Sequence, residues 1–178
     1  MTAPAPLRGP ITRRILDAML LRRELYESVA ADPLAGSQAA GVICLCAVAQ
    51  PNPLTPVIGA WAFVVAILFG LARWWVFTGL VWPVARLIAW RPVEFRRLLR
   101  CLGFAEAPAI VNVFGVALSP EAQSWLGAAA SAGILATTVV AVRAACNVST
   151  NRALVIGIIS FAVYLVLGVI SSVIIQMT

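Results

Sequence analysis

Residues 96–108, RRLLRCLGFAEAP, decide how the chain is placed relative to a membrane. A run of arginines ends in an apolar segment, and that segment carries Glu106 and then Pro108. Arginines beside a hydrophobic run are typical of the cytoplasmic edge of a membrane. A carboxylate and a proline inside the membrane need partners from neighbouring helices. We therefore interpret the rest of the chain around this point of re-entry.

The composition predicts a polytopic membrane protein without catalytic or metal chemistry. Of the 178 residues, 62% are hydrophobic and 11% are charged, whereas soluble domains have about 45–50% apolar and about 25% charged residues. The chain has no histidine, which excludes His-ligated haem, most zinc sites and His-based proton relays. Its four cysteines include no CxxC pair, so neither a disulfide framework nor a metal site is expected. We expect no cofactor and no enzyme activity.

The N-terminal segment, residues 1–31, is predicted to lie in the cytoplasm. Residues 1–10 are rich in proline, and residues 11–30 follow with the periodicity of one amphipathic helix. The apolar arc of this helix holds Ile11, Ile15 and Val29, and most of its charged residues lie opposite. Such a helix lies either in the plane of the lipid head groups or over the cytoplasmic ends of other helices. The pattern fits both positions.

Residues 32–178 are predicted to form an all-α domain of five transmembrane helices. Asp32 and Pro33 form a helix start, and the first span is rich in small residues that allow close helix packing. The second span is longer than a membrane core of about 30 Å requires, so we expect it to bend near Gly79 and Pro83. The five spans are predicted at residues 33–50, 57–90, 102–118, 119–141 and 153–175.

The distribution of arginine predicts the orientation of these spans. Five arginines precede the first span, five lie in the second-to-third connection with Arg86 included, and two lie between the fourth and fifth spans. The other connections have none. Because positive loops stay in the cytoplasm, we expect the N-terminus inside and the C-terminus outside. The second-to-third connection presents the predicted cytoplasmic basic face, Arg91, Arg96, Arg97 and Arg100.

Arg73 and Glu106 are the two ionisable residues that this topology places within the hydrocarbon. Both lie roughly 6 Å from its inner boundary, on consecutive spans. Because an unpaired charge is costly there, we predict an intramembrane ion pair. Two other interpretations stay open: Arg73 extends to the interface, or the two residues line a path for an ion or a proton.

The start of the third span, LGFAEAP, resembles a signature of the Yip-domain family of multipass membrane proteins. Gly103, Ala105 and Pro108 match its Gly-aromatic-Ala-x-x-Pro pattern. The resemblance extends from Asp32 to the C-terminus and implies five spans with the N-terminus inside. Eukaryotic members bind Rab-type GTPases, but the long cytoplasmic region of those members has no counterpart here. The short chain and its use of arginine alone resemble a bacterial member, for which the resemblance implies a fold more than a function.

These observations together predict a non-enzymatic protein of the bacterial inner membrane. It would act through contacts with other membrane proteins or lipids, as a scaffold, a membrane organiser or an accessory subunit of a larger complex. Its expected partners are the bilayer, with anionic head groups at the cytoplasmic arginines, and other membrane proteins or further copies of itself. Nucleic acid is not expected, although the net charge is +6. The alternative is a small oligomeric transporter or pore.

Overall fold

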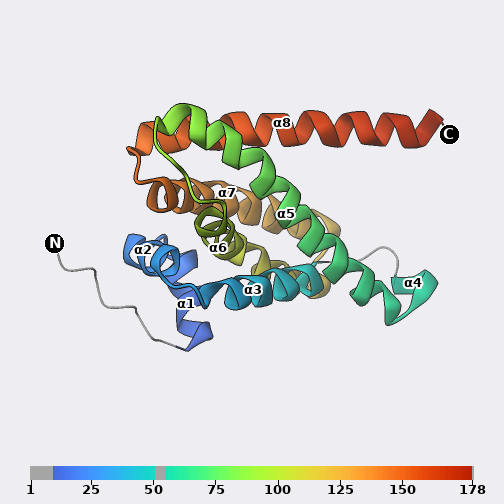
Figure 1. Cartoon of the computed structure of the whole chain (residues 1–178). Coiled ribbons are helices and arrows are strands. Elements are labelled where there is room, and N and C mark those ends of the chain that lie inside the picture. Colours follow the sequence, from blue (N-terminus) through green and yellow to red (C-terminus); the bar gives the residue numbers. More distant parts are fainter. Residues whose placement is uncertain (1–9, 51–54, 178) are drawn as a thin grey trace.

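The structure is a computed structural model that describes residues 10–50 and 55–177, with side chains described for residues 10–50 and 56–164. The proline-rich residues 1–9 and residues 51–54 of the first-to-second connection lie outside the described part. Every regular element of the described part is helical (Figure 1). The elements are α1 (Ile11–Met19), α2 (Arg23–Ala31), α3 (Ala35–Ala49), α4 (Thr55–Ile58), α5 (Trp61–Ala89), α6 (Phe95–Ala105), η1 (Ala107–Ala117), α7 (Pro120–Cys146) and α8 (Thr150–Met177).

The N-terminal helix is broken in two, so the prediction of one helix over residues 11–30 was wrong. Between α1 and α2 the chain turns at Leu21, whose φ of 57° is in the left-handed region. The amide of Arg22 donates to the carbonyl of Asp17 at 3.0 Å, and the two side chains form an ion pair at 3.0 Å. The turn lets α2 pack on α6 and α7, where Tyr26 is fully buried. This buried face of α2 therefore lies on protein.

Three helical segments are long and apolar enough to cross a membrane. They are α5, the combined segment Phe95–Ala117, and α7. The helix α3 and the searched part of α8, Thr150–Tyr164, are apolar but shorter. All five predicted spans thus fall on helices, and three of the searched segments meet the criteria of length and hydropathy for a full span.

The third predicted span begins earlier than expected and changes its helical type. It starts at Phe95 rather than Leu102, and the α-helix ends at Ala105. From Ala107 the chain continues as a 3₁₀ helix, in which the amide of Ala109 donates to the carbonyl of Glu106 at 2.9 Å. Pro108 explains the change, because its nitrogen carries no hydrogen and its ring hinders a continuing α-helix.

The connections on the predicted cytoplasmic side are shorter than expected. The helix α7 continues through Arg143 to Cys146 and ends at Asn147, whose φ is 51°. The helix α8 begins at Thr150. The predicted basic loop over residues 143–152 is therefore a three-residue turn, because the last turn of α7 stays helical with Ala144 to Cys146 buried against the protein.

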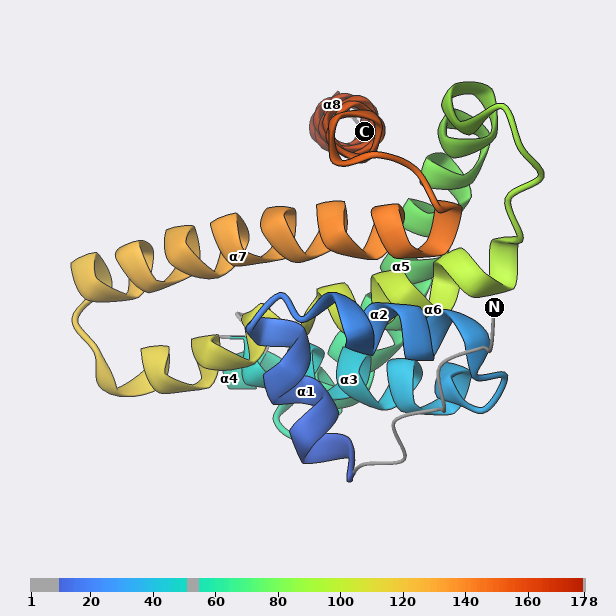
Figure 2. The ribbon, with the colours of Figure 1, turned by 90° about the vertical axis from the view of Figure 1, so that its left-hand side faces the viewer.

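The long helices cross one another and do not form a parallel bundle. In Figure 2, α8 is seen end-on, whereas α7 lies across the view with η1 antiparallel below it. Ser119 caps the start of α7 as predicted, because its hydroxyl accepts from the amide of Ala122 at 3.4 Å. In Figure 1, α3 and α8 run from left to right, and α5 packs against both. The end of α5, which contains Pro83, changes direction in this view.

Candidate functional site

An ion pair between Arg73 and Glu106 lies at the centre of the candidate site. Nη2 of Arg73, on α5, is 2.9 Å from Oε2 of Glu106, at the junction of α6 and η1. The side chains are 34% and 15% exposed, respectively. The structure thus brings together the two residues that the sequence singled out by their depth.

Two side chains from neighbouring helices hold the junction that carries Glu106. Because the helix changes from α to 3₁₀ geometry, the carbonyls around residue 105 lose the amide donors that a continuing α-helix would supply. The hydroxyl of Thr137, on α7, lies 2.6 Å from the carbonyl oxygen of Ala105. The thiol of Cys46, on α3, donates to the carbonyl of Glu106 at 3.2 Å. Both carbonyls at the helix break thus accept hydrogen bonds from side chains of other helices.

The sequence did not indicate these two donors. Cys46 resembles any small buried hydrophobic residue. A threonine in an apolar helix usually bonds its own backbone, and Thr137 also lies 2.9 Å from the carbonyl oxygens of Gly133 and of Ile134 on its own helix. A hydroxyl has one proton, so the bond to Ala105 competes with the bonds within α7. The only signal was Pro108 itself, because the backbone groups that a proline frees in an apolar helix need partners from neighbouring helices.

The predicted third-span motif has a packing role at each position. A methyl group at Gly103 would lie 2.7 Å from the Cβ of Ala39 and 3.1 Å from the ring of Trp74. Ala105 is fully buried and offers the carbonyl that Thr137 approaches. Pro108 packs on α7, where a methyl group at Gly133 would lie 2.9 Å from the proline Cβ. The motif thus sets how closely α6 and η1 approach α3, α5 and α7.

A cavity of about 540 Å³ adjoins the ion pair. It lies between α5, α7 and α8, and Arg73 and Glu106 form part of its wall. Thr138, Ser131 and Tyr164 add hydroxyl groups to the wall. The rest of the wall is mainly apolar and comes from Phe77, Ile134, Leu135, Ala136, Val139, Leu154, Gly157, Ile158, Phe161 and Ala162.

The four arginines of the predicted basic face differ in their surroundings: two are exposed, and two donate hydrogen bonds to backbone carbonyls of other helices. Arg91 and Arg96 are exposed. In contrast, Nη2 of Arg97 donates to the carbonyl of Ala144 at 3.0 Å, near the end of α7. Nη2 of Arg100 donates to the carbonyl of Ala30 at 2.8 Å, near the end of α2. The expectation that all four arginines face lipid head groups therefore needs correction, because Arg97 and Arg100 bind carbonyls at helix C-termini.

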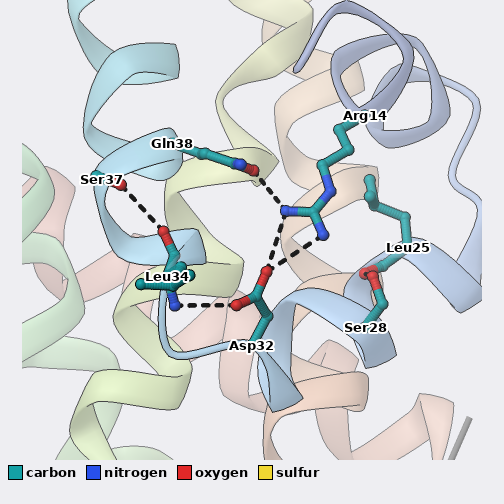
Figure 3. Close-up of polar contacts among 7 residues, drawn as sticks. All are labelled: Arg14, Leu25, Ser28, Asp32, Leu34, Ser37 and Gln38. Atoms are coloured by element: carbon teal, nitrogen blue, oxygen red, sulfur yellow. Dashed lines mark hydrogen bonds and ion pairs between the residues drawn. The ribbon is translucent and has the colours of Figure 1, made fainter. Parts of the chain in front are cut away.

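A second charged group connects the N-terminal helices to α3 (Figure 3). Arg14, 3% exposed, forms an ion pair with Asp32 at 3.3 Å and donates to Oε1 of Gln38. Asp32 also accepts from the amide of Leu34 at 2.9 Å, but α3 begins at Ala35 with Leu34 as its N-cap, two residues later than predicted. The sequence offered one signal for this group: at 100° per residue, Arg14 falls at the edge of the apolar arc of α1.

No family model, no curated protein and no solved structure matches the chain. The resemblance to the Yip-domain family therefore stays a prediction.

Proposed function

We propose that this chain is a non-enzymatic integral membrane protein of the bacterial inner membrane, which acts through contacts with other membrane proteins or lipids. One observation carries the proposal: large apolar side chains are exposed along the helices. On α5, Trp61 is 71% exposed, Leu68 is 62% exposed and Phe69 is 69% exposed. Water-soluble monomers rarely expose continuous apolar surface of this kind, whereas a bilayer accommodates it.

The proposed topology has five spans, with the N-terminus in the cytoplasm and the C-terminus outside. The arginine distribution supports it, as do the three helical segments of spanning length. Because α7 and α8 cross steeply (Figure 2), both helices can span only if each is strongly tilted. A shorter helix such as α3 is accommodated by local thinning of the bilayer.

Reporter fusions test the topology directly. We expect alkaline phosphatase to be active when fused after Thr178 and inactive when fused after Glu94, in the second-to-third connection. Green fluorescent protein should show the opposite pattern. A fluorescent C-terminal fusion without phosphatase activity would show that α8 does not cross the membrane, and the five-span topology would be wrong.

Native mass spectrometry of the protein, extracted gently from its own membrane, tests the proposed mode of action. We expect masses that include other membrane proteins or tightly bound lipid. A homo-oligomer that supports an ion or proton flux in proteoliposomes, with that flux abolished by Glu106→Gln in a folded protein, would overturn the proposal. That result would instead support the transporter or pore, with Glu106 in its path.

A further inference from the structure

We infer that the cavity between α5, α7 and α8 binds a neutral amphiphile that has one long apolar chain and an uncharged ester or ketone carbonyl. The carbonyl would lie at Arg73 and Glu106, and the chain would lie along the facing sides of α7 and α8. This inference deepens the proposed function and rests on its placement of the chain in a membrane.

The size and lining of the cavity suit such a chain. Its volume of about 540 Å³ is within the range of roughly 300–1,000 Å³ that small-molecule sites have. Apolar side chains from three helices face it, including Phe77 on α5, Val139 on α7 and Ile158 on α8. Its two charged groups, Arg73 and Glu106, lie 2.9 Å apart, so the site has one charged region in a mainly apolar wall, as an amphiphile requires.

The charges at this region favour an uncharged head group. Arg73 and Glu106 carry opposite charges 2.9 Å apart, so together they contribute no net charge. An added carboxylate or ammonium would leave one uncompensated charge in apolar surroundings, and such a charge is costly. A neutral group that hydrogen-bonds to the pair avoids this cost.

The donors at the pair favour a carbonyl over other neutral groups. A guanidinium has five N–H donors and no acceptor, and the ion pair engages Nη2. The arginine therefore has more donors than a single carboxylate oxygen can accept. An ester or ketone oxygen, which only accepts hydrogen bonds, complements this excess.

The cavity is open to the outside of the helices. Several of its wall residues are exposed, among them Leu135 to 43%, Leu154 to 48% and Ile158 to 60%. In a bilayer this side would face lipid tails, so the amphiphile would enter laterally from the membrane without passing through water.

Photolabelling of the purified full chain in detergent tests the site. The probe is a monoacylglycerol whose acyl chain carries a diazirine and a terminal alkyne, and labelled peptides are identified by mass spectrometry. We expect saturable labelling of α7 and α8 around residues 134–139 and 154–161. Long-chain ester should compete with the probe, and a fatty acid ionised at the pH of the assay should compete about tenfold less well, a difference of about 1.4 kcal/mol. Better competition by the carboxylate would overturn the choice of a neutral head group.

A matched pair of leucine substitutions separates this site from general contact with detergent or lipid. A Cβ at Gly157 would meet Val139 at an ordinary 3.8 Å, so Gly157→Leu fills the cavity without a clash at the backbone. A Cβ at Gly127, also on a long helix, meets nothing within 4 Å, so Gly127→Leu is the control. We expect Gly157→Leu to lower saturable labelling about tenfold and Gly127→Leu to leave it unchanged.

Equal labelling of the two leucine variants would show general contact only, and the site would be rejected. The double variant Arg73→Met, Glu106→Leu keeps the apolar wall and removes the charged pair together with its hydrogen-bond donors; it should abolish the preference for ester over an alkane probe. An unchanged preference in a folded double variant would also contradict the inference. Because these assays use detergent, their failure is distinct from failure of the topology measured by reporter fusions.

Discussion

The hydroxyl of Thr137 lies 2.6 Å from the carbonyl oxygen of Ala105, one residue before the position where the backbone leaves the α-helix at Glu106. This contact joins α7 to the junction that carries the ion pair. The thiol of Cys46 reaches the carbonyl of Glu106 from α3. The backbone that carries the carboxylate is therefore held by α3 and α7, and changes in those helices should affect the carboxylate.

Replacing the Thr137 hydroxyl should destabilise the fold. Thr137→Val keeps the shape of the side chain but leaves the carbonyl of Ala105 without this donor, at a cost of about 1–3 kcal/mol. Thr78→Val is the matched control, because the equally buried Thr78 bonds only the Trp74 carbonyl of its own helix, at 2.9 Å. Thermal unfolding in detergent measures both variants. Equal losses of stability would show that the bond between helices contributes nothing beyond a bond within one helix.

Adding a methyl group at Gly103 should push α6 away from α3 and α5. The new Cβ would lie 2.7 Å from the Cβ of Ala39, so we expect Gly103→Ala to lower the free energy of unfolding by about 1–3 kcal/mol. Adding Ala39→Gly should recover part of this loss by removing the clashing atom. Gly127→Ala, in open space, should not destabilise. A neutral Gly103→Ala variant would contradict the close approach of these helices.

The ion pair should show coupling in a double-mutant cycle. We expect Arg73→Met and Glu106→Gln each to cost about 2 kcal/mol; this is less than a fully buried pair would lose, because the Arg73 side chain is 34% exposed. The double variant should be more stable than the sum of the two losses predicts, with a coupling of about 1–3 kcal/mol. Additive losses would mean that the contact does not contribute to stability.

Removing Arg100 should loosen α2. Arg100→Met removes the donor to the Ala30 carbonyl but also a buried Nε atom without a partner among the described residues. The net cost should therefore be only about 1 kcal/mol, which corresponds to roughly fivefold faster trypsin cleavage near Arg22 and Arg23. The control Arg96→Met removes an exposed arginine and should leave this rate unchanged. Equal rates for both variants would show that Arg100 does not hold α2.

Stability should fall at alkaline pH through Tyr26. Burial raises the pKa of this phenol above its ordinary value of 10, and the hydroxyl donates to the carbonyl of Ala18 at 3.3 Å. The unfolded chain therefore loses this proton near pH 10 while the folded chain keeps it, so stability is complete below pH 10 and falls above it, by at most about 1.4 kcal/mol per pH unit.

The variant Tyr26→Phe isolates this effect. Chemical unfolding in detergent between pH 9 and pH 11 should show a shallower loss of stability for the variant than for the unaltered protein, because the variant has no phenol at residue 26 to ionise. Identical slopes would mean that Tyr26 is not buried in its neutral form.

Much of the local structure follows from the sequence because its causes act over a few residues. Ser119 and Pro120 start α7, and Pro108 ends the preceding α-helix, by local backbone chemistry. The break at Leu21 was not predicted, because the apolar periodicity continues across it. Leucine is uncommon at positive φ, and the conformation is held by the packing of α2 on α6 and α7.

The ion pair between Arg73 and Glu106 could be predicted from the sequence for two reasons. The two residues are expected at similar depths in consecutive spans, and an unpaired charge in hydrocarbon is costly. Only the tertiary structure revealed the cavity and the crossing of α7 and α8. It also revealed that Arg97 and Arg100 bind backbone carbonyls of other helices. In this chain both the packed and the exposed faces of the long helices are apolar, so hydrophobic periodicity does not distinguish them. The sequence thus determined which segments are apolar helices and led to the prediction that Arg73 and Glu106 pair. The packing of those helices decided which faces meet and where space is left between them.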